Sequence, residues 1–291
     1  MPNIRHQILV IPRNCQYDDG YEKNDSKNTQ IKFTDITPSV NGLQRIGMVS
    51  SALWTDYNND TWPDLMLVGE YMPITLFTNQ HGKLVQSDIP NLEKTSGWWN
   101  SLTAGDFDHD GDIDYLVGNL GKNTQYHASK HEPVTVYGKD FDKNGLMDPI
   151  MTHFKDGEEQ MVHARDDLNK QITAMRARFK DYTSYAEVPF KESFRKDELE
   201  DALALQAYHF ESVYLENKGK DGFIMHELPL EAQFAPLFGM QTGDFNADGH
   251  LDVLAVGNSF ATVVQTGRYD ALGGVLLLGN GKGQFQIDRH S

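Results

Sequence analysis

The sequence contains one cysteine, Cys15, few basic residues and no long apolar run in its 291 residues. A single cysteine excludes an internal disulfide and a cysteine-rich zinc or iron–sulfur site. Lysine and arginine together number 26 against 42 aspartates and glutamates, a formal charge of −16, and they form no basic patch. Because nucleic-acid binding requires clustered cations against phosphates, we expect no nucleic-acid partner. No apolar run approaches the roughly 18 residues that span a bilayer, so we expect no membrane insertion.

The first thirty residues differ in character from the rest of the chain. Their one apolar run, Ile8-Leu9-Val10-Ile11, is too brief for the core of a signal peptide. The rest of 1–30 is mostly polar and suits a core poorly. We therefore expect an N-terminal arm, either disordered or contributing one strand at Gln7 to Ile11, in front of a folded unit at 31–291. With 25 Gly, 12 Tyr and 15 Phe beside only 23% charged residues, the composition favours a folded, β-rich protein.

A nine-residue acidic pattern occurs four times along the chain. The copies occupy residues 56–64 (DYNNDTWPD), 106–114 (DFDHDGDID), 140–148 (DFDKNGLMD) and 244–252 (DFNADGHLD), and we name them the first to fourth acidic loops. All four place Asp or Asn at positions 1, 3, 5 and 9 and an aromatic residue at position 2. Glycine holds position 6 in three copies, whereas Thr61 holds it in the first. Such self-similarity indicates a repeat architecture.

Short apolar stretches flank the acidic loops. The first, second and fourth loops are each followed by an apolar run that ends at glycine, at 65–69, 115–118 and 253–257. Runs of four or five residues indicate buried strands, because they are too short for helices. Further strands are expected at 74–78, 83–86, 213–216, 223–227 and 275–278. Strands at this spacing with one motif per unit predict an all-β fold, a β-propeller whose blades are small antiparallel sheets.

The spacing of the acidic loops is uneven, since successive loops begin 50, 34 and 104 residues apart. The first interval fits one blade. The second is too short for four strands, so the second and third loops are expected to share a blade or to bound an abbreviated one. The third interval is long enough to contain an insertion. We therefore expect four or five blades, or part of a ring.

Helical signals replace strand signals between about 165 and 208. Two sets of mostly apolar residues recur at helical spacing there. The first set is Leu168, Ile172, Met175, Arg176 and Phe179, and the second is Leu199, Ala202, Leu203 and Leu205. They predict a helical hairpin inserted between strands of one blade.

The acidic loops have the ligand types that a hard cation requires. Ca²⁺ takes six to eight oxygen ligands from carboxylates, amides, carbonyls and water. Positions 1, 3 and 5 can turn inward together, Gly at position 6 permits the turn that aims the carbonyl of position 7, and position 9 adds a carboxylate. The predicted ligands for up to four Ca²⁺ are Asp56, Asn58, Asp60, Trp62 and Asp64; Asp106, Asp108, Asp110, Asp112 and Asp114; Asp140, Asp142, Asn144, Leu146 and Asp148; and Asp244, Asn246, Asp248, His250 and Asp252.

Other interpretations of the acidic loops remain open. Asp, Asn and Gly also suit plain surface turns, although without a cation the repulsion among the aspartates would raise their pKa values. Thr61 and Pro63 make the first loop the least typical. Mg²⁺ prefers more water and fewer protein ligands, and zinc would require Cys or a spaced His pair.

The repeat units resemble the FG-GAP/VCBS repeat proteins, whose calcium loops also occur in integrin α-subunit propellers. The residues that carry this resemblance are Phe238-Gly239 with 243–252 and Trp98-Trp99-Asn100 with 104–114. The order of units, with Asp148-Pro-Ile after the third loop and the helical insertion, is similar to bacterial secreted proteins of the ASPIC/UnbV type. The resemblance covers roughly residues 31–290. It implies a calcium-stabilised β-propeller outside the cell, on its surface or in the periplasm. Because residues 31–35 look like the outermost strand of a preceding, absent repeat, we expect that the chain is cut from something longer or truncated at its front.

Two hypotheses of function follow. The first is a non-catalytic calcium-binding propeller, expected to be monomeric, that recognises a protein or carbohydrate ligand. The alternative is a carbohydrate-active lyase or hydrolase with its site at the central channel. Its candidate residues are His127, His131, His153, His163 and Arg165. Because no nucleophile elbow, H-E-x-x-H motif or phosphate loop is present, the sequence favours the binding module. Trp98 and Trp99 offer rings for stacking on a sugar, and one of the two is expected to pack between blades.

Overall fold

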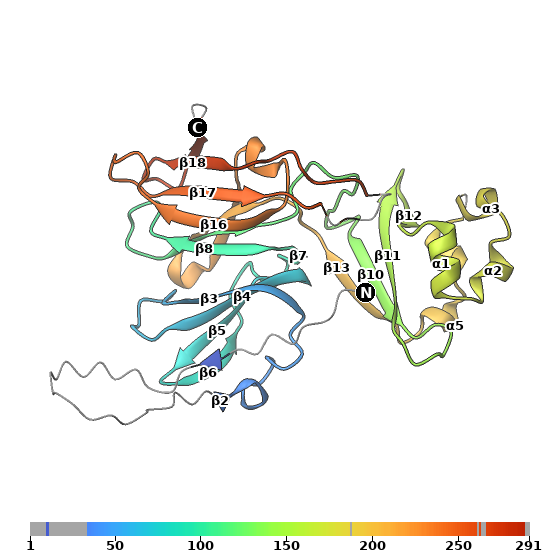
Figure 1. The fold of residues 1–291 in the computed structure, drawn as a ribbon. Coiled ribbons are helices and arrows are strands. Elements are labelled where there is room, and N and C mark those ends of the chain that lie inside the picture. The colour runs from blue at the N-terminus through green and yellow to red at the C-terminus, as the bar shows by residue number, and fades with distance from the viewer. Residues whose placement is uncertain (1–9, 12–33, 187, 261, 263–265, 289–291) are drawn as a thin grey trace, which may run out of the picture.

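The computed structural model describes residues 10–11, 34–186, 188–260, 262 and 266–288. Within them, seventeen strands form four antiparallel sheets. Figure 1 shows three of these sheets stacked on one another, with the fourth sheet and its helices to one side. The fold is therefore all-β and propeller-like, with a small helical insertion, as the repeats predicted.

The first stacked sheet has the order β3-β4-β5-β6, and β7 pairs with β4. Its strands are β3 (Met48–Thr55), β4 (Asp64–Met72), β5 (Thr75–Gln80), β6 (Lys83–Ser87) and β7 (Gly97–Trp98). The first acidic loop joins β3 to β4. The predicted strands at 65–69, 74–78 and 83–86 are thereby confirmed.

The second stacked sheet is built from two distant parts of the chain. Its order is β15-β14-β9-β8, with β8 (Ser101–Gly105), β9 (Asp114–Gly118), β14 (Val213–Asn217) and β15 (Phe223–Glu227). The second acidic loop joins β8 to β9. Residues 119–212 leave the sheet after β9 and return at β14.

The third stacked sheet has the order β16-β17-β18-β19. Its strands are β16 (Leu237–Gly243), β17 (Asp252–Gly257), β18 (Val275–Gly279) and β19 (Phe285–Ile287), and the fourth acidic loop joins β16 to β17. The short 3₁₀ turns η1 (Thr37–Ser39), η2 (Gly219–Asp221) and η3 (Leu230–Gln233) lie in connections.

Side chains along the second strand of a stacked sheet point alternately to its two faces, and this explains why the sheets pack face to face. In β9, Tyr115 and Val117 face the core shared with the first sheet, whereas Leu116 faces the core shared with the third sheet. Successive side chains of a strand point to opposite faces, so a run that is apolar throughout is buried on both. In β17 only one face is covered, and Leu254 and Val256 on the other remain 43% and 45% exposed.

The segment that leaves the second sheet forms a sheet of its own. Its order is β12-β11-β10-β13, with β10 (Val134–Lys139), β11 (Asp148–Lys155), β12 (Glu158–Met161) and β13 (Leu203–Ala207). The third acidic loop joins β10 to β11. The second and third loops therefore neither share a blade nor bound an abbreviated one, because the third belongs to this inserted sheet.

Five short helices lie between β12 and β13 and pack their apolar side chains on the inserted sheet. They are α1 (Arg165–Gln171), α2 (Met175–Arg178), α3 (Tyr182–Ala186), α4 (Phe190–Ser193) and α5 (Lys196–Leu199). The predicted insertion between strands of one sheet is present, but it is not a two-helix hairpin. Leu203 and Leu205, assigned to its second helix, lie in β13, because their alternate spacing also fits a strand and β10 offers a partner.

The N-terminal part of the chain is described only in β1 (Val10–Ile11), which pairs with β2 (Thr34–Asp35). The remaining residues of the predicted arm at 1–30 lie outside the described residues. Among the described helices, none has both the length and the apolar character of a membrane span.

Candidate functional site

Each acidic loop occupies the same place in its sheet, between the first two strands in chain order. Position 9 is the first residue of the second strand in every case. These residues are Asp64, Asp114, Asp148 and Asp252, at the starts of β4, β9, β11 and β17. The predicted unit of strand, acidic loop and strand is therefore present four times.

The four acidic loops also share one backbone conformation, with positive φ at positions 4 and 6. At position 4, φ is 57° at Asn59, 61° at His109, 61° at Lys143 and 61° at Ala247. At position 6, φ is 93° at Gly111, 87° at Gly145 and 87° at Gly249. Thr61 adopts 70° at the same position, although a β-branched residue is strained there. The first loop thus keeps the geometry of the others despite its departure from the pattern.

Hydrogen bonds from the loop backbone turn the side chains of positions 1, 3 and 5 inward. In the fourth loop, the Asp244 carboxylate accepts from the N–H groups of Asp248 (3.2 Å) and Gly249 (3.0 Å). Asn246 Oδ1 accepts from the Asp248 N–H at 2.9 Å, and Asp248 Oδ1 accepts from His250 at 2.8 Å. The first and third loops repeat this pattern. The predicted side-chain ligands of one loop are thus gathered on its inner side.

In the second loop, the aspartate at position 9 is anchored across the sheet. Asp114 is fully buried, and it accepts from Tyr214 Oη at 2.7 Å, from the Asn217 N–H at 2.8 Å and from the Phe107 N–H at 3.3 Å. Burial raises the pKa of Asp114 to about 6, and these donors offset part of that rise. The negative charge of this carboxylate is therefore costly at neutral pH unless a cation lies nearby.

The other position 9 aspartates are buried as well. Asp252 accepts from the N–H groups of Phe245 (3.0 Å) and Gly279 (2.9 Å), so it too bridges to the third strand of its sheet. Asp64 accepts from the Asn79 N–H at 2.7 Å. Burial raises the pKa of both Asp64 and Asp148.

Two carboxylate oxygens in these loops are buried without a hydrogen-bond donor, namely Asp64 Oδ2 and Asp106 Oδ1. A buried polar atom without a partner is costly, and a cation would satisfy it. In the second loop, Asp106, Asp108 and Asp114 each present an oxygen within 4.8 Å of the others. Asp140, Asp142 and Asp148 do the same in the third loop. The oxygen atoms of these loops therefore fit a hard divalent cation. In the first and fourth loops, position 3 offers an Asn amide oxygen in place of a carboxylate.

Contacts between acidic loops of neighbouring sheets were not predicted from the sequence. Asn59 Nδ2 in the first loop donates to Asp112 Oδ1 in the second at 2.7 Å. His109 Nε2 in the second loop lies 3.0 Å from His250 Nδ1 in the fourth. Both contacts join position 4 of one loop to position 7 of the next. The residue types at these two positions differ among the four loops. The first, second and fourth loops therefore form a continuous row across the three stacked sheets.

Three of the histidines proposed for an enzymatic site are either exposed or packed against an aromatic ring. His127 and His131 are exposed. His153 packs its ring against Tyr126, with centroids 5.4 Å apart, and burial lowers its pKa. None of these three is paired with a carboxylate within the described part of the chain.

His163 and Arg165 hold the inserted sheet to its helices. His163 Nε2 accepts from the Met151 N–H at 3.1 Å, and burial lowers the pKa of this histidine. Arg165 donates to the carbonyls of Phe179 (2.9 Å) and Lys180 (2.8 Å). These bonds engage His163 Nε2 and the Arg165 guanidinium in contacts that hold this part of the chain together.

The two adjacent tryptophans have different environments. Trp99 is fully buried between the first and second sheets, and its indole N–H donates to the Thr95 carbonyl at 2.9 Å. Trp98 instead lines a cavity of about 400 Å³ between the stacked sheets and the inserted sheet, and His163 lines it too. The expectation that one of the pair packs between sheets is thus met by Trp99.

A comparison with curated proteins found no match. A comparison with protein families found one, an FG-GAP-like repeat at residues 56–117. The match runs from the first acidic loop to β9 and therefore spans two of the stacked sheets. Repeats of this family are typical of extracellular β-propeller modules that serve adhesion or binding. The resemblance to the ASPIC/UnbV type stays a prediction. Residues 56–117 of this chain are therefore similar to an FG-GAP-like repeat.

Proposed function

We propose that this protein is a calcium-stabilised binding module that acts outside the cell. The observation that carries the proposal is the repeated loop conformation with its inward oxygens, together with the two buried carboxylate oxygens that lack a donor, Asp64 Oδ2 and Asp106 Oδ1. In each loop the side chains of positions 1, 3, 5 and 9 and the carbonyl of position 7 would hold one Ca²⁺. The ligand would be a protein or a carbohydrate, in keeping with the usual role of such repeats.

The expected role of the ion is structural. Each acidic loop connects two strands, and position 9 of the second and fourth loops also bonds to the third strand. A cation would remove the repulsion among the loop aspartates and fix the strands to one another. Four Ca²⁺ would bring the formal charge from −16 to −8. No conformational switch is required, since the loops join strands rather than movable helices.

The size of the effect can be estimated. Extracellular calcium modules bind with dissociation constants of roughly 10⁻⁴–10⁻³ M. With a dissociation constant of about 0.2 mM and about 2 mM free ion, each site would stabilise the fold by about 1.4 kcal/mol. Four such sites would contribute on the order of 5–6 kcal/mol, which is comparable to the stability of many domains. At cytosolic calcium levels this contribution would nearly vanish, which supports an extracellular setting.

Calcium titration of the full chain tests the proposal. We expect calorimetry to show binding of up to four ions and calcium to raise the melting temperature by on the order of 10 °C relative to chelator. Asp106→Asn should remove one ion from the stoichiometry, whereas Asp88→Asn, an exposed aspartate outside the loops, should leave it unchanged. Magnesium at the same concentration should stabilise the protein less.

Two results would overturn the calcium proposal. One is the absence of calcium uptake in the calorimeter. The other is a melting temperature that chelator leaves unmoved. If magnesium stabilised the protein as strongly as calcium, the loops would be general divalent sites.

A further inference from the structure

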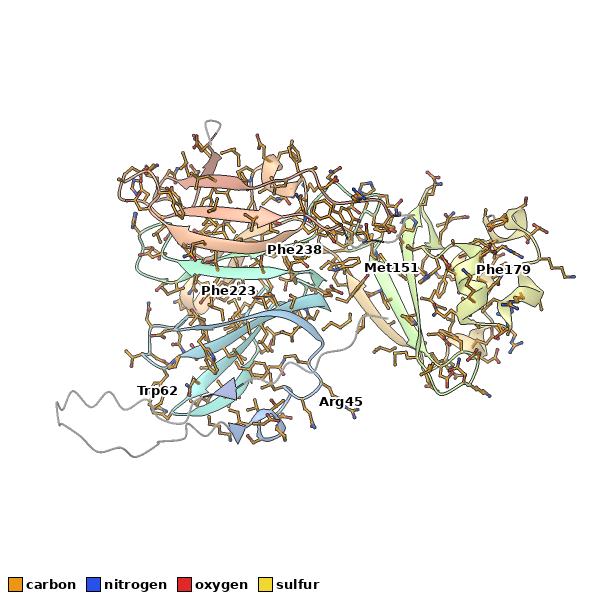
Figure 2. All side chains as sticks on the ribbon, viewed as in Figure 1. Arg45, Trp62, Met151, Phe179, Phe223 and Phe238 are labelled. Atoms are coloured by element: carbon orange, nitrogen blue, oxygen red, sulfur yellow. The ribbon has the colours of Figure 1, made fainter. Side chains whose placement is uncertain are left out.

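The cavity of about 400 Å³ lies where four parts of the fold meet, away from the acidic loops. Its lining includes Glu70 from β4, Trp98 from β7, Phe238 from β16 and Met151 from β11. Figure 2 labels Phe238 and Met151 on the two sides of the junction between the stacked sheets and the inserted sheet. Cavities of this size, concave and formed between structural units, are typical of small-ligand sites.

Glu70 places a carboxylate in this cavity and has no cationic partner within the described part of the chain. Its strand neighbour is Trp98, whose side chain donates a hydrogen bond to it. Burial raises the pKa of Glu70. Among the described residues, no lysine or arginine lines the cavity. The one basic side chain in the lining is His163, and burial disfavours its charged form.

A second carboxylate, Asp167, also lines the cavity. It is exposed, and Lys170 lies 3.3 Å away from it. Asp167 therefore adds negative charge at the mouth but already has a partner. Glu70 therefore supplies the carboxylate that a ligand would meet inside the cavity, and an ammonium group beside it would favour its ionised form.

Aromatic rings form much of the wall around Glu70. Trp98, Tyr126, Phe238 and Tyr269 all line the cavity. Trp98 is packed against Tyr71, with ring centroids 5.3 Å apart, and Tyr269 is held by a hydrogen bond from or to Thr124 Oγ1 at 3.0 Å. These rings are fixed by their neighbours, and the face of an aromatic ring attracts a cation that has lost its water.

We propose that this cavity binds a small organic cation, with its ammonium group between the Glu70 carboxylate and the rings of Trp98, Tyr126 and Tyr269. The ammonium group balances the charge of Glu70, and its alkyl part contacts Met151, Phe238 and Leu120. The inference rests on the proposed role as a binding module and adds a small-molecule site to the protein or carbohydrate ligand proposed for that module. It does not depend on calcium, because none of the predicted calcium ligands lines the cavity.

Choline and its uncharged carbon isostere, 3,3-dimethyl-1-butanol, test the proposal on the full chain. We expect saturable binding of choline chloride by titration calorimetry at constant ionic strength, and binding of the isostere about tenfold weaker or absent. Glu70→Gln, which keeps the size of the side chain, should weaken choline binding by about tenfold or more. Trp98→Leu should weaken it by several fold. Glu93→Gln, an exposed glutamate outside the cavity, should leave it unchanged.

Three outcomes would overturn this inference. They are equal affinities for choline and the isostere, no saturable choline binding in the millimolar range, and undiminished choline binding by Glu70→Gln. The comparison of the two ligands uses the unmodified protein, so it stands even if a variant fails to fold. A calcium-dependent melting temperature measured on the same sample separates the two proposals, because its persistence without choline binding would contradict only the cavity.

Discussion

The second and third acidic loops have the same pattern but different settings. In both, φ is 61° at position 4, and glycine holds position 6 at 93° and 87°. The second loop lies within the stack of sheets, and its Asp114 bonds to Tyr214 and Asn217 from distant parts of the chain. The third lies on the inserted sheet, and its Asp148 accepts a hydrogen bond from the N–H of its own loop residue Phe141 at 3.0 Å.

The difference shows which part of the motif is local and which is tertiary. Positions 3 and 5 accept backbone N–H groups of their own loop in both copies, so this part of the loop takes one shape. Position 1 differs, because Asp140 accepts from two loop N–H groups whereas Asp106 Oδ1 is buried without a donor among the described residues. The hydrogen bonds of the aspartate at position 9 depend on which strand the fold places beside it. Matched substitutions in the two loops can test this division.

The largest difference is expected at position 9. In chelator, Asp114→Asn should lower the free energy of unfolding by about 3 kcal/mol, because it leaves buried donors without their carboxylate. Asp148→Asn should lower it by about 1 kcal/mol, since one backbone bond is affected. Urea unfolding followed by fluorescence measures both. Equal costs at the two positions would show that the anchoring of Asp114 carries no extra stability.

Substitution of the glycine at position 6 should cost about the same stability in the two loops. A Cβ atom at Gly111 or Gly145 would meet nothing within 4 Å, so Ala is disfavoured there only by the positive φ. We expect Gly111→Ala and Gly145→Ala each to lower the free energy of unfolding by about 1–2 kcal/mol. The same urea titration tests this. A much larger cost in one loop would mean that its backbone is held by tertiary contacts as well.

The smallest change in stability is expected from a change of pH, through Asp114 in the second loop. Since the pKa of Asp114 is raised to about 6 in the fold, the folded state retains a proton that the unfolded state releases above about pH 4. Stability of the calcium-free protein should therefore rise by about 1 kcal/mol from pH 7 to pH 5 through this group. The measurement is the difference in urea unfolding between the unmodified protein and Asp114→Asn at the two pH values.

Calcium should reverse the sign of this pH effect. Calcium binding requires ionised carboxylates, so protons compete with it and acid should destabilise the loaded protein. Asp148→Asn should change the pH dependence less than Asp114→Asn does. If the unmodified protein and Asp114→Asn shared one pH profile in chelator, the buried charge of Asp114 would have no energetic effect.

Much of the fold was predictable because the repeat consists of residues that are close together in the sequence. The strands after the first, second and fourth acidic loops, at 65–69, 115–118 and 253–257, were predicted from short apolar runs that end at glycine. Leu203 and Leu205 were misassigned to a helix because their spacing fits both a helix and a strand, and only pairing with β10 decides between them. The inserted sheet was missed because the third loop looks like the others in sequence, and nothing local marks a departure from the second sheet.

The candidate sites divide in the same way. The inward side chains of the acidic loops follow from residue types and spacing, because Asp, Asn and Gly fix such turns by themselves. The row of contacts from Asn59 to Asp112 and from His109 to His250 could not be predicted, since it requires three sheets to be stacked in a given order. The Glu70 cavity likewise combines residues from β4, β7, β11 and β16 that no sequence pattern links.

The sequence by itself determined the four acidic loops, their conformation and the strands that border them, because short-range hydrogen bonds and backbone preferences act within a few residues. Only the tertiary structure decided that residues 119–212 form a separate sheet and helices, that Asp114 is anchored to Tyr214, and that Glu70 faces aromatic rings without a counter-charge. Those features depend on which surfaces pack together, and the burial that follows from packing sets the energy of each charge.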